Sequence, residues 1–164
     1  MKRLIITAIS FLFFCLGCFA QDINGLDICK KRTKSEFIQL FGQPKDYSKY
    51  TPAKGDDGLG LGYTESYEFD GIWIDYSEKI GIYSYGISSP DYHVLTDIVS
   101  AEGIKVGDNL SKLDNYLKYL SKPEYITSGP MKGAYVSDFI QWEGTMIFDV
   151  VNGKITCIAY QFPL

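Results

Sequence analysis

The chain has 164 residues, of which 46% are hydrophobic and 22% charged, so it can bury a core and is neither fibrous nor disordered. It carries 16 Lys and Arg against 20 Asp and Glu, a formal net charge of −4. This balance argues against a nucleic-acid partner, because there is no surplus of basic side chains to meet phosphates.

Residues 1–20 have the pattern of a secretory signal peptide. The basic pair Lys2-Arg3 precedes an apolar run over residues 4–16, followed by small residues. The run is shorter than the ~20 residues that a membrane-spanning helix needs. We therefore expect an exported protein, periplasmic or secreted, whose mature part (21–164) is a single α+β domain. Without Lys2 and Arg3, 14 basic residues face 20 acidic ones.

Two ways of processing this signal remain open. Cleavage after Ala20 would release the mature chain, whereas lipidation of Cys18 would make it an outer-membrane-anchored lipoprotein. Leu16-Gly17-Cys18 resembles a lipoprotein box, but Cys15 stands where such a box normally has an aliphatic residue. We expect contact with a membrane only through such a lipid anchor.

Cys29 and Cys157 are the cysteines of the mature chain. An exported compartment is oxidising enough for them to pair, and the disulfide would close a loop of 157 − 29 = 128 residues. The alternative is two buried thiols that act as small hydrophobic side chains.

An internal duplication organises the mature chain. Residues 25–44 match residues 103–123 at an offset of 78 to 79, which defines a first unit at about 25–87 and a second at about 103–164. Each unit begins with a short extended segment and a helix. Thr33 with Glu36, and Ser111 with Asp114, have the spacing of a capping box at the start of each helix.

Antiparallel strands follow each helix. Asp70-Gly71 and Asn152-Gly153 are the dipeptides that two-residue type I′ hairpin turns favour. We predict an α+β fold of two tandem units, each a helix followed by a three-stranded antiparallel meander. The two units would form one sheet with the helices on one face.

The hairpins also predict the strand register. Phe69 would face Ile72, Val150 would face Ile155, Phe148 would face Cys157, and Trp73 would lie opposite Ile82. The face under the helices then collects Tyr67, Phe69, Ile72, Ile74, Tyr83, Tyr85, Ile87, Ile140, Trp142, Ile147, Ile158, Tyr160 and Phe162.

The opposite face mixes large apolar with polar side chains, which is typical of a protein-recognition surface. Its predicted apolar anchors are Trp73, Phe148, Met146 and Phe139, and its predicted polar rim is Glu68, Asp75 and Gln141. Trp73 is the foremost anchor, since Trp is enriched at interface hot spots. The alternative is that the long loop 48–62 or the linker 88–100 covers this face.

The sequence offers little catalytic chemistry. His93 is the only histidine, and no Gly-x-Ser-x-Gly nucleophile elbow accompanies it. Gly55-Asp56-Asp57-Gly58 lacks the spacing of an EF-hand, and Cys and His are too few for zinc. We expect no catalytic residue, no metal and no cofactor. The alternative function is a small cell-envelope hydrolase that uses Asp75 and Glu68 as paired carboxylates.

The segment Gly103-Ile104-Lys105-Val106-Gly107-Asp108-Asn109-Leu110-Ser111-Lys112-Leu113, together with the export signal and the two units, resembles a known pattern. It is similar to the tandem-repeat fold of β-lactamase inhibitor proteins, shared with small outer-membrane assembly lipoproteins. The first unit departs from it, since Lys30 and Lys31 stand where the second has Gly107 and Asp108. The resemblance implies a non-catalytic module that binds another envelope protein, as an inhibitor or an assembly scaffold. It assigns no individual contact residue.

Overall fold

The structure, a computed structural model, describes residues 22–52, 60–96, 102–140 and 143–163. The predicted export signal with Cys18 lies outside the described residues, as do Gln141 and Trp142. Within the described residues, no helix has both the length and the apolar character needed to cross a membrane.

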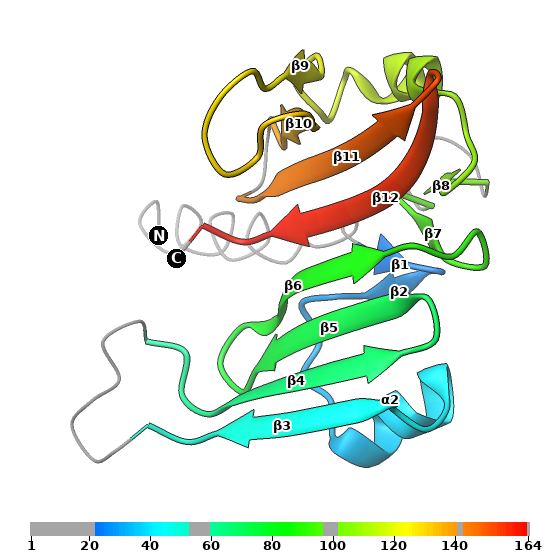
Figure 1. The fold of residues 1–164 in the computed structure, drawn as a ribbon. Helices are drawn as coiled ribbons and strands as arrows, with labels where there is room; N and C mark the ends of the chain where they lie inside the picture. Colours follow the sequence, from blue (N-terminus) through cyan, green and yellow to red (C-terminus); the bar gives the residue numbers. More distant parts are fainter. Residues whose placement is uncertain (1–21, 53–59, 97–101, 141–142, 164) are drawn as a thin grey trace, which may run out of the picture.

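The fold is mixed α+β, as predicted, and is dominated by an eight-stranded antiparallel sheet (Figure 1). Its strands, in spatial order, are β3 (Asp46–Tyr50), β4 (Thr64–Phe69), β5 (Ile72–Ser77), β6 (Gly81–Ile87), β12 (Lys154–Gln161), β11 (Thr145–Val151), β10 (Tyr135–Asp138) and β9 (Glu124–Tyr125). A second sheet has four two-residue strands, in the order β2 (Leu26–Asp27), β1 (Asp22–Ile23), β7 (His93–Val94) and β8 (Ile104–Lys105). The helices are α2 (Lys34–Phe41) and the 3-10 helix η1 (Leu110–Tyr116).

The large sheet has more strands than predicted. Four strands, β3 to β6, follow α2 where three were expected, and four strands, β9 to β12, follow η1. The additional strands are β3, part of which was assigned to the loop 48–62, and the two-residue β9. Both are edge strands with mostly exposed side chains, so they lack the apolar alternation that reveals a strand in sequence.

The two helices differ in how they begin. At α2 the capping box is confirmed: the Thr33 hydroxyl accepts from the Glu36 backbone N–H, and the Glu36 carboxylate accepts from the Thr33 backbone N–H. The capping box predicted at Ser111 and Asp114 is wrong. Asn109 occupies the N-cap position of η1 without a side-chain hydrogen bond, and Ser111 already lies inside the helix.

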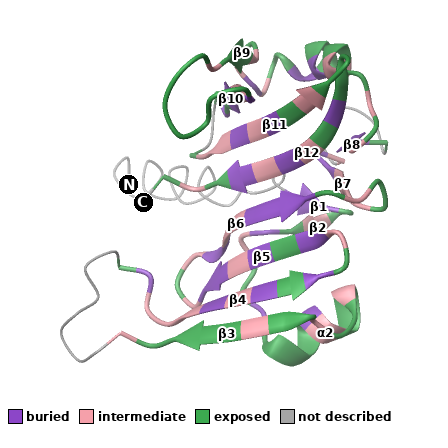
Figure 2. Ribbon diagram, viewed as in Figure 1, coloured by how far each residue is buried: buried purple, intermediate pink, exposed green. Residues whose placement is uncertain are grey.

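The core lies on one face of the large sheet, and buried residues alternate with more exposed ones along β4 and β5 (Figure 2). Phe37 of α2 packs on Tyr67 and Tyr76, with ring centroids 4.9 and 5.4 Å apart. Residues from both sheets and both helices form one buried cluster. It includes Ile23, Phe37, Tyr67, Ile74, Tyr85, Ile87, Val94, Ile104, Leu113, Tyr116, Met146, Phe148, Ile158 and Tyr160.

The predicted register holds in the first hairpin, where Phe69 faces Ile72 and Tyr67 faces Ile74. In the second hairpin Val150 faces Ile155 as predicted, but a β-bulge follows, and Phe148 faces Ile158 instead of Cys157. In the pairing of β5 with β6, Trp73 faces Gly86 instead of Ile82, four residues from the predicted partner. A second bulge leaves Tyr83 between the residues of β6 that pair with β5. Each bulge inserts one residue and reverses the phase of alternation beyond it.

This reversal corrects three of the predicted anchors. Met146 and Phe148 point into the core, at 1% and 0% exposure, and Phe139 is 7% exposed. The bulge places Ile155 and Ile158 on the same buried face. Phe148 of β11 faces Ile158 and is therefore buried with it. Ile140, predicted for the core, is instead 57% exposed. Met146, Phe148 and Phe139 therefore stabilise the fold and do not form an accessible binding surface.

Candidate binding site on the open face of the sheet

We use "open face" for the face of the large sheet that points away from the core. The strand pairing assigns to it Asp46, Ser48, Tyr50, Thr64, Ser66, Glu68, Trp73, Asp75, Ser84, Gly86, Glu124, Val136, Asp138, Thr145, Ile147, Asp149, Cys157, Ala159 and Gln161. Both helices and three of the four short strands, β1, β7 and β8, contribute buried residues to the cluster on the other face. Of the predicted binding residues that the structure describes, Trp73, Glu68 and Asp75 are on the open face.

Trp73 is 40% exposed, and the other large aromatic side chain that the pairing puts on this face, Tyr50, lies at the β3 edge. Trp73 projects from β5 toward Gly86 of β6, its cross-strand neighbour. A Cβ atom at Gly86 would lie 2.2 Å from the indole Nε1, so the indole occupies the space that a side chain at position 86 would need. Glycine therefore holds the ring close to the sheet.

A cleft of about 750 Å³ opens beside Trp73 at one end of the sheet. It is lined by Lys45, Glu68, Phe69, Asp70, Gly71, Ile72, Trp73, Gly86, Ile87, Ser88, Ser89, Pro90 and Cys157. The loop after β6 is tied to the β4–β5 turn, since the backbone N–H groups of Ser88 and Ser89 donate to the Gly71 carbonyl at 2.9 and 3.2 Å. The cleft thus has walls held by backbone hydrogen bonds.

An ion pair marks the rim of the cleft. The Lys45 ammonium lies 2.9 Å from the Asp70 carboxylate, and both side chains are largely exposed. The hydrogen bond that the ammonium donates to Asp70, together with the charge of that carboxylate, raises the pKa of Lys45. Sequence reasoning found the Asp70-Gly71 turn but not its role as a wall of the cleft. A glycine inside an otherwise apolar strand, Gly86, was the available signal.

The two carboxylates of the alternative hydrolase hypothesis are diagonal neighbours on β4 and β5. Glu68 faces Trp73, and Asp75 faces Ser66, one pair further along. Asp75 is half-buried and accepts a hydrogen bond from the Ser66 hydroxyl at 2.6 Å. Only Glu68 of the two lines the cleft.

Cys157 lines the cleft, and burial raises the pKa of its thiol, with a further contribution from the charge of Asp149. Cys29 and Cys157 do not form the disulfide considered above. Cys157 lies at the Ile87 end of β6, whereas Cys29 lies beside Gly81 at the other end. Six steps along the strand, from Gly81 to Ile87, span roughly 20 Å, whereas a disulfide needs Cα atoms within about 7 Å.

On the core side, near the β3 edge, Glu65 forms a separate polar cluster. Its carboxylate accepts from the hydroxyls of Tyr67 and Tyr47 at 2.6 and 3.0 Å and lies 3.2 Å from the Lys49 ammonium. Burial acts to raise the pKa of Glu65, but the hydrogen bonds from Tyr67, Tyr47 and Lys49 outweigh it and hold the pKa below its ordinary value.

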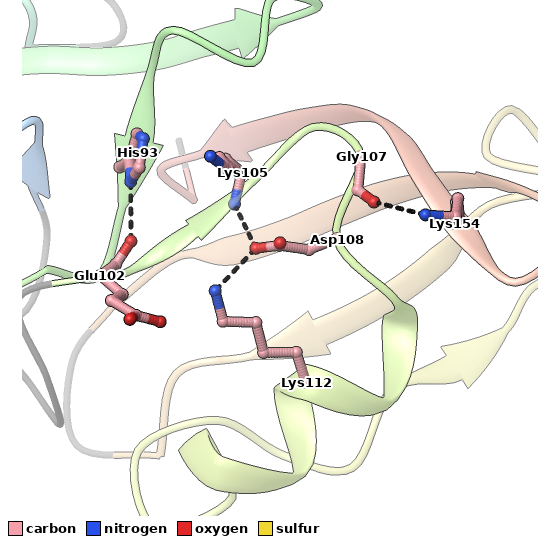
Figure 3. A network of polar contacts seen from close by, with 7 residues as sticks. All are labelled: His93, Glu102, Lys105, Gly107, Asp108, Lys112 and Lys154. Atoms are coloured by element: carbon pink, nitrogen blue, oxygen red, sulfur yellow. Dashed lines mark hydrogen bonds and ion pairs between the residues drawn. The ribbon is translucent and has the colours of Figure 1, made fainter.

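The segment that carried the family resemblance, residues 103–113, contributes no lining residue to the cleft. Its polar contacts fix a loop (Figure 3). The Asp108 carboxylate accepts from the Lys105 backbone N–H at 3.1 Å and from the Lys112 ammonium at 2.9 Å. The Lys154 ammonium donates to the Gly107 carbonyl at 3.3 Å. The ring Nδ1 of His93 lies 2.7 Å from the Glu102 carbonyl oxygen, within the same network. Among the described residues, no three His, Cys, Asp or Glu side chains gather as metal ligands would.

No protein-family model matches the chain, and no curated protein matches it in sequence. Among solved structures, the chain is similar to a DUF4309 family protein, YjgB, of Bacillus subtilis. The identity is 10%, the likeness covers 82% of this chain and 80% of that one, and the TM-score is 0.40.

Proposed function

We propose that this chain is an exported, non-catalytic protein-binding module that engages another envelope or extracellular protein through its open face. One observation carries the proposal. Trp73 is left 40% exposed beside a cleft of about 750 Å³, on the sheet face opposite the helices. An exposed Trp next to a polar rim is the composition of an interface hot spot.

The anchor set is smaller than the sequence predicted. Trp73 is its centre, with the half-buried Ile147 further across the sheet, while Glu68 and the Lys45–Asp70 ion pair form the polar rim. Gln141, outside the described residues, stays a proposed rim residue.

The proposal includes the tandem-repeat relationship to β-lactamase inhibitor proteins and outer-membrane assembly lipoproteins. The element order supports it. Two short strands, a helix and four antiparallel strands occur in that order twice, as β1 to β6 and as β7 to β12. The sheet order runs β3 to β6 and then β12 to β9, which puts the last strands of the two halves side by side.

We place the partner in the envelope or outside the cell because residues 1–20 have the pattern of a signal peptide. If Cys18 is lipidated, the module acts at the outer membrane as a scaffold. If cleavage follows Ala20, it acts as a released inhibitor.

Site-specific photo-crosslinking tests the proposal. A photoreactive phenylalanine analogue replaces Trp73 in one variant and Leu117 in the other. Leu117 is similarly exposed, at 39%, but directly follows η1 on the covered side. After illumination in the envelope fraction of the source organism, we expect a defined crosslinked protein from position 73 and none from position 117. Equal crosslinking at both positions, or none at position 73 in a folded variant, would contradict the proposal.

A further inference from the structure

Carboxylates gather on the open face of the large sheet. The open face carries six carboxylates, distributed from β3 to β9: Asp46, Glu68, Asp75, Glu124, Asp138 and Asp149. All are exposed except Asp75, which is half-buried. Lys154, at the tip of the β11–β12 hairpin, directs its ammonium to the Gly107 carbonyl.

Three other lysines contact aromatic rings or carboxylates on the covered side of the sheet or on the segments around it. Lys34 of α2 lies over the Tyr47 ring, at 3.2 Å from its centroid, and Lys49 pairs with Glu65. Lys112 of η1 pairs with Asp108. These three lysines are therefore committed away from the acidic face, whereas Lys45 lies at the rim of the cleft, where it pairs with Asp70.

Several of these carboxylates accept hydrogen bonds from neutral donors. Asp75 accepts from the Ser66 hydroxyl, Asp138 from the Thr145 hydroxyl at 2.6 Å, and Asp46 from the Tyr47 backbone N–H at 2.8 Å. These bonds orient the carboxylates and leave their negative charge in place. Like charges on one surface repel one another, and a cationic partner would relieve that repulsion.

The cleft is lined by a carboxylate, Glu68, and by an aromatic ring, Trp73. Glu68 faces Trp73 across the β4–β5 pair, so a carboxylate and an indole border the same space. A Lys or Arg side chain satisfies both groups at once, by an ion pair with the carboxylate and a cation–π contact with the ring. The chain makes such contacts itself, with Lys49 3.7 Å from the centroid of the Tyr63 ring.

We infer that the partner of the open face is a protein with a Lys- and Arg-rich surface, which places one such side chain in the cleft against Trp73 and Glu68. This inference rests on the proposed function and adds the chemistry of the partner. The carboxylates lie on β3, β4 and β5 toward one edge and on β11, β10 and β9 toward the other, and the eight strands, about 4.8 Å apart, span roughly 34 Å. That span fits an extended cationic surface better than a single small cation.

An NMR titration of the full mature chain tests this inference. The probe is a hexapeptide that alternates Arg and Gly, and the control probe has Gln in place of Arg. We expect the Trp73 indole and the amides of β4, β5 and β6 to shift with the Arg peptide only. Binding should weaken as salt screens the charges.

Two matched double variants test whether the carboxylates of the open face are responsible for binding the Arg peptide. Glu68→Gln combined with Asp149→Asn removes two carboxylates from the open face, and should weaken binding of the Arg peptide about five-fold. Glu102→Gln combined with Asp114→Asn removes the same charge from exposed positions beside β8 and on η1, and should change binding less than about two-fold.

Each of the alternative results would contradict either the cationic partner or the proposed binding function. Equal binding of the Arg and Gln peptides, or equal weakening by the two double variants, overturns the cationic partner, while crosslinking at position 73 would still support the binding function. Free arginine binding as tightly as the peptide would replace the protein partner by a small cation. If neither peptide shifts the open face and position 73 forms no crosslink, the proposed function fails as well.

Discussion

At the scale of single residues, Glu65 is a carboxylate held in an otherwise apolar layer by its donors. Two tyrosine hydroxyls and the Lys49 ammonium reach it, and its pKa lies below the ordinary value. Its ionised form therefore favours the folded state. The stability it contributes is present above the unfolded pKa and is lost as the pH falls through the lower, folded pKa.

We therefore expect Glu65→Gln to lower the free energy of unfolding at neutral pH by about 2 kcal/mol, because hydrogen bonds to a charged group are lost. Urea denaturation at a series of pH values measures this. The loss should shrink as the pH falls below the ordinary pKa of 4.5. Tyr47→Phe, which removes one donor, should cost less, about 1 kcal/mol. Curves for the wild type and Glu65→Gln that stay parallel down to low pH would refute this role of Glu65.

At the scale of elements, the pairing of β5 with β6 depends on the match between Trp73 and Gly86. The bulge in β6 brings the two residues opposite each other, and the indole fills the space above the glycine. The constraint at Gly86 is therefore steric and comes from the neighbouring strand.

Gly86→Ala should destabilise the chain by about 2 kcal/mol, because the new methyl group must displace the indole. In a Trp73→Ala background the same change should cost much less, since alanine suits a strand better than glycine once the space is free. A double-mutant cycle by chemical denaturation measures the coupling, which we expect to exceed about 1 kcal/mol. Additive effects would mean that the ring does not rest on Gly86.

At the scale of the whole molecule, β6 and β12 join the two halves of the sheet. Their pairing runs from Ile158 opposite Ile87 to Gln161 opposite Ser84. Across this junction the rings of Tyr85 and Tyr160 stack with centroids 5.4 Å apart, and the Tyr85 hydroxyl donates to the Met146 sulfur at 3.8 Å. The buried cluster is continuous through the junction.

This continuity predicts a single cooperative unfolding transition for the mature chain. Tryptophan fluorescence and far-ultraviolet circular dichroism should give coincident urea curves. Tyr160→Ala should move both curves together, with a loss of about 3 to 5 kcal/mol. Two separate transitions, or a variant that shifts one probe and not the other, would show that the halves fold independently.

How much of the fold could be predicted depends on the range of the interactions. The capping box of α2 and the Asp70-Gly71 hairpin were found because a few neighbouring residues specify them. The exposure of Trp73 and Glu68 followed from that hairpin by alternation. The same reasoning failed for Met146 and Phe148, since it assumed unbroken alternation through the second hairpin.

Local sequence was thus sufficient for the α+β class, the turns and the first helix, each stabilised by contacts between residues close in the chain. Long-range packing was needed for the bulges, the edge strands and the junction of β6 with β12. A bulge reverses which side chains are buried, and the packing of Ile155, Ile158 and Tyr160 against the rest of the core selects the phase. The cleft beside Trp73 depends on this same packing, because its walls come from strands and loops that meet only in the folded sheet.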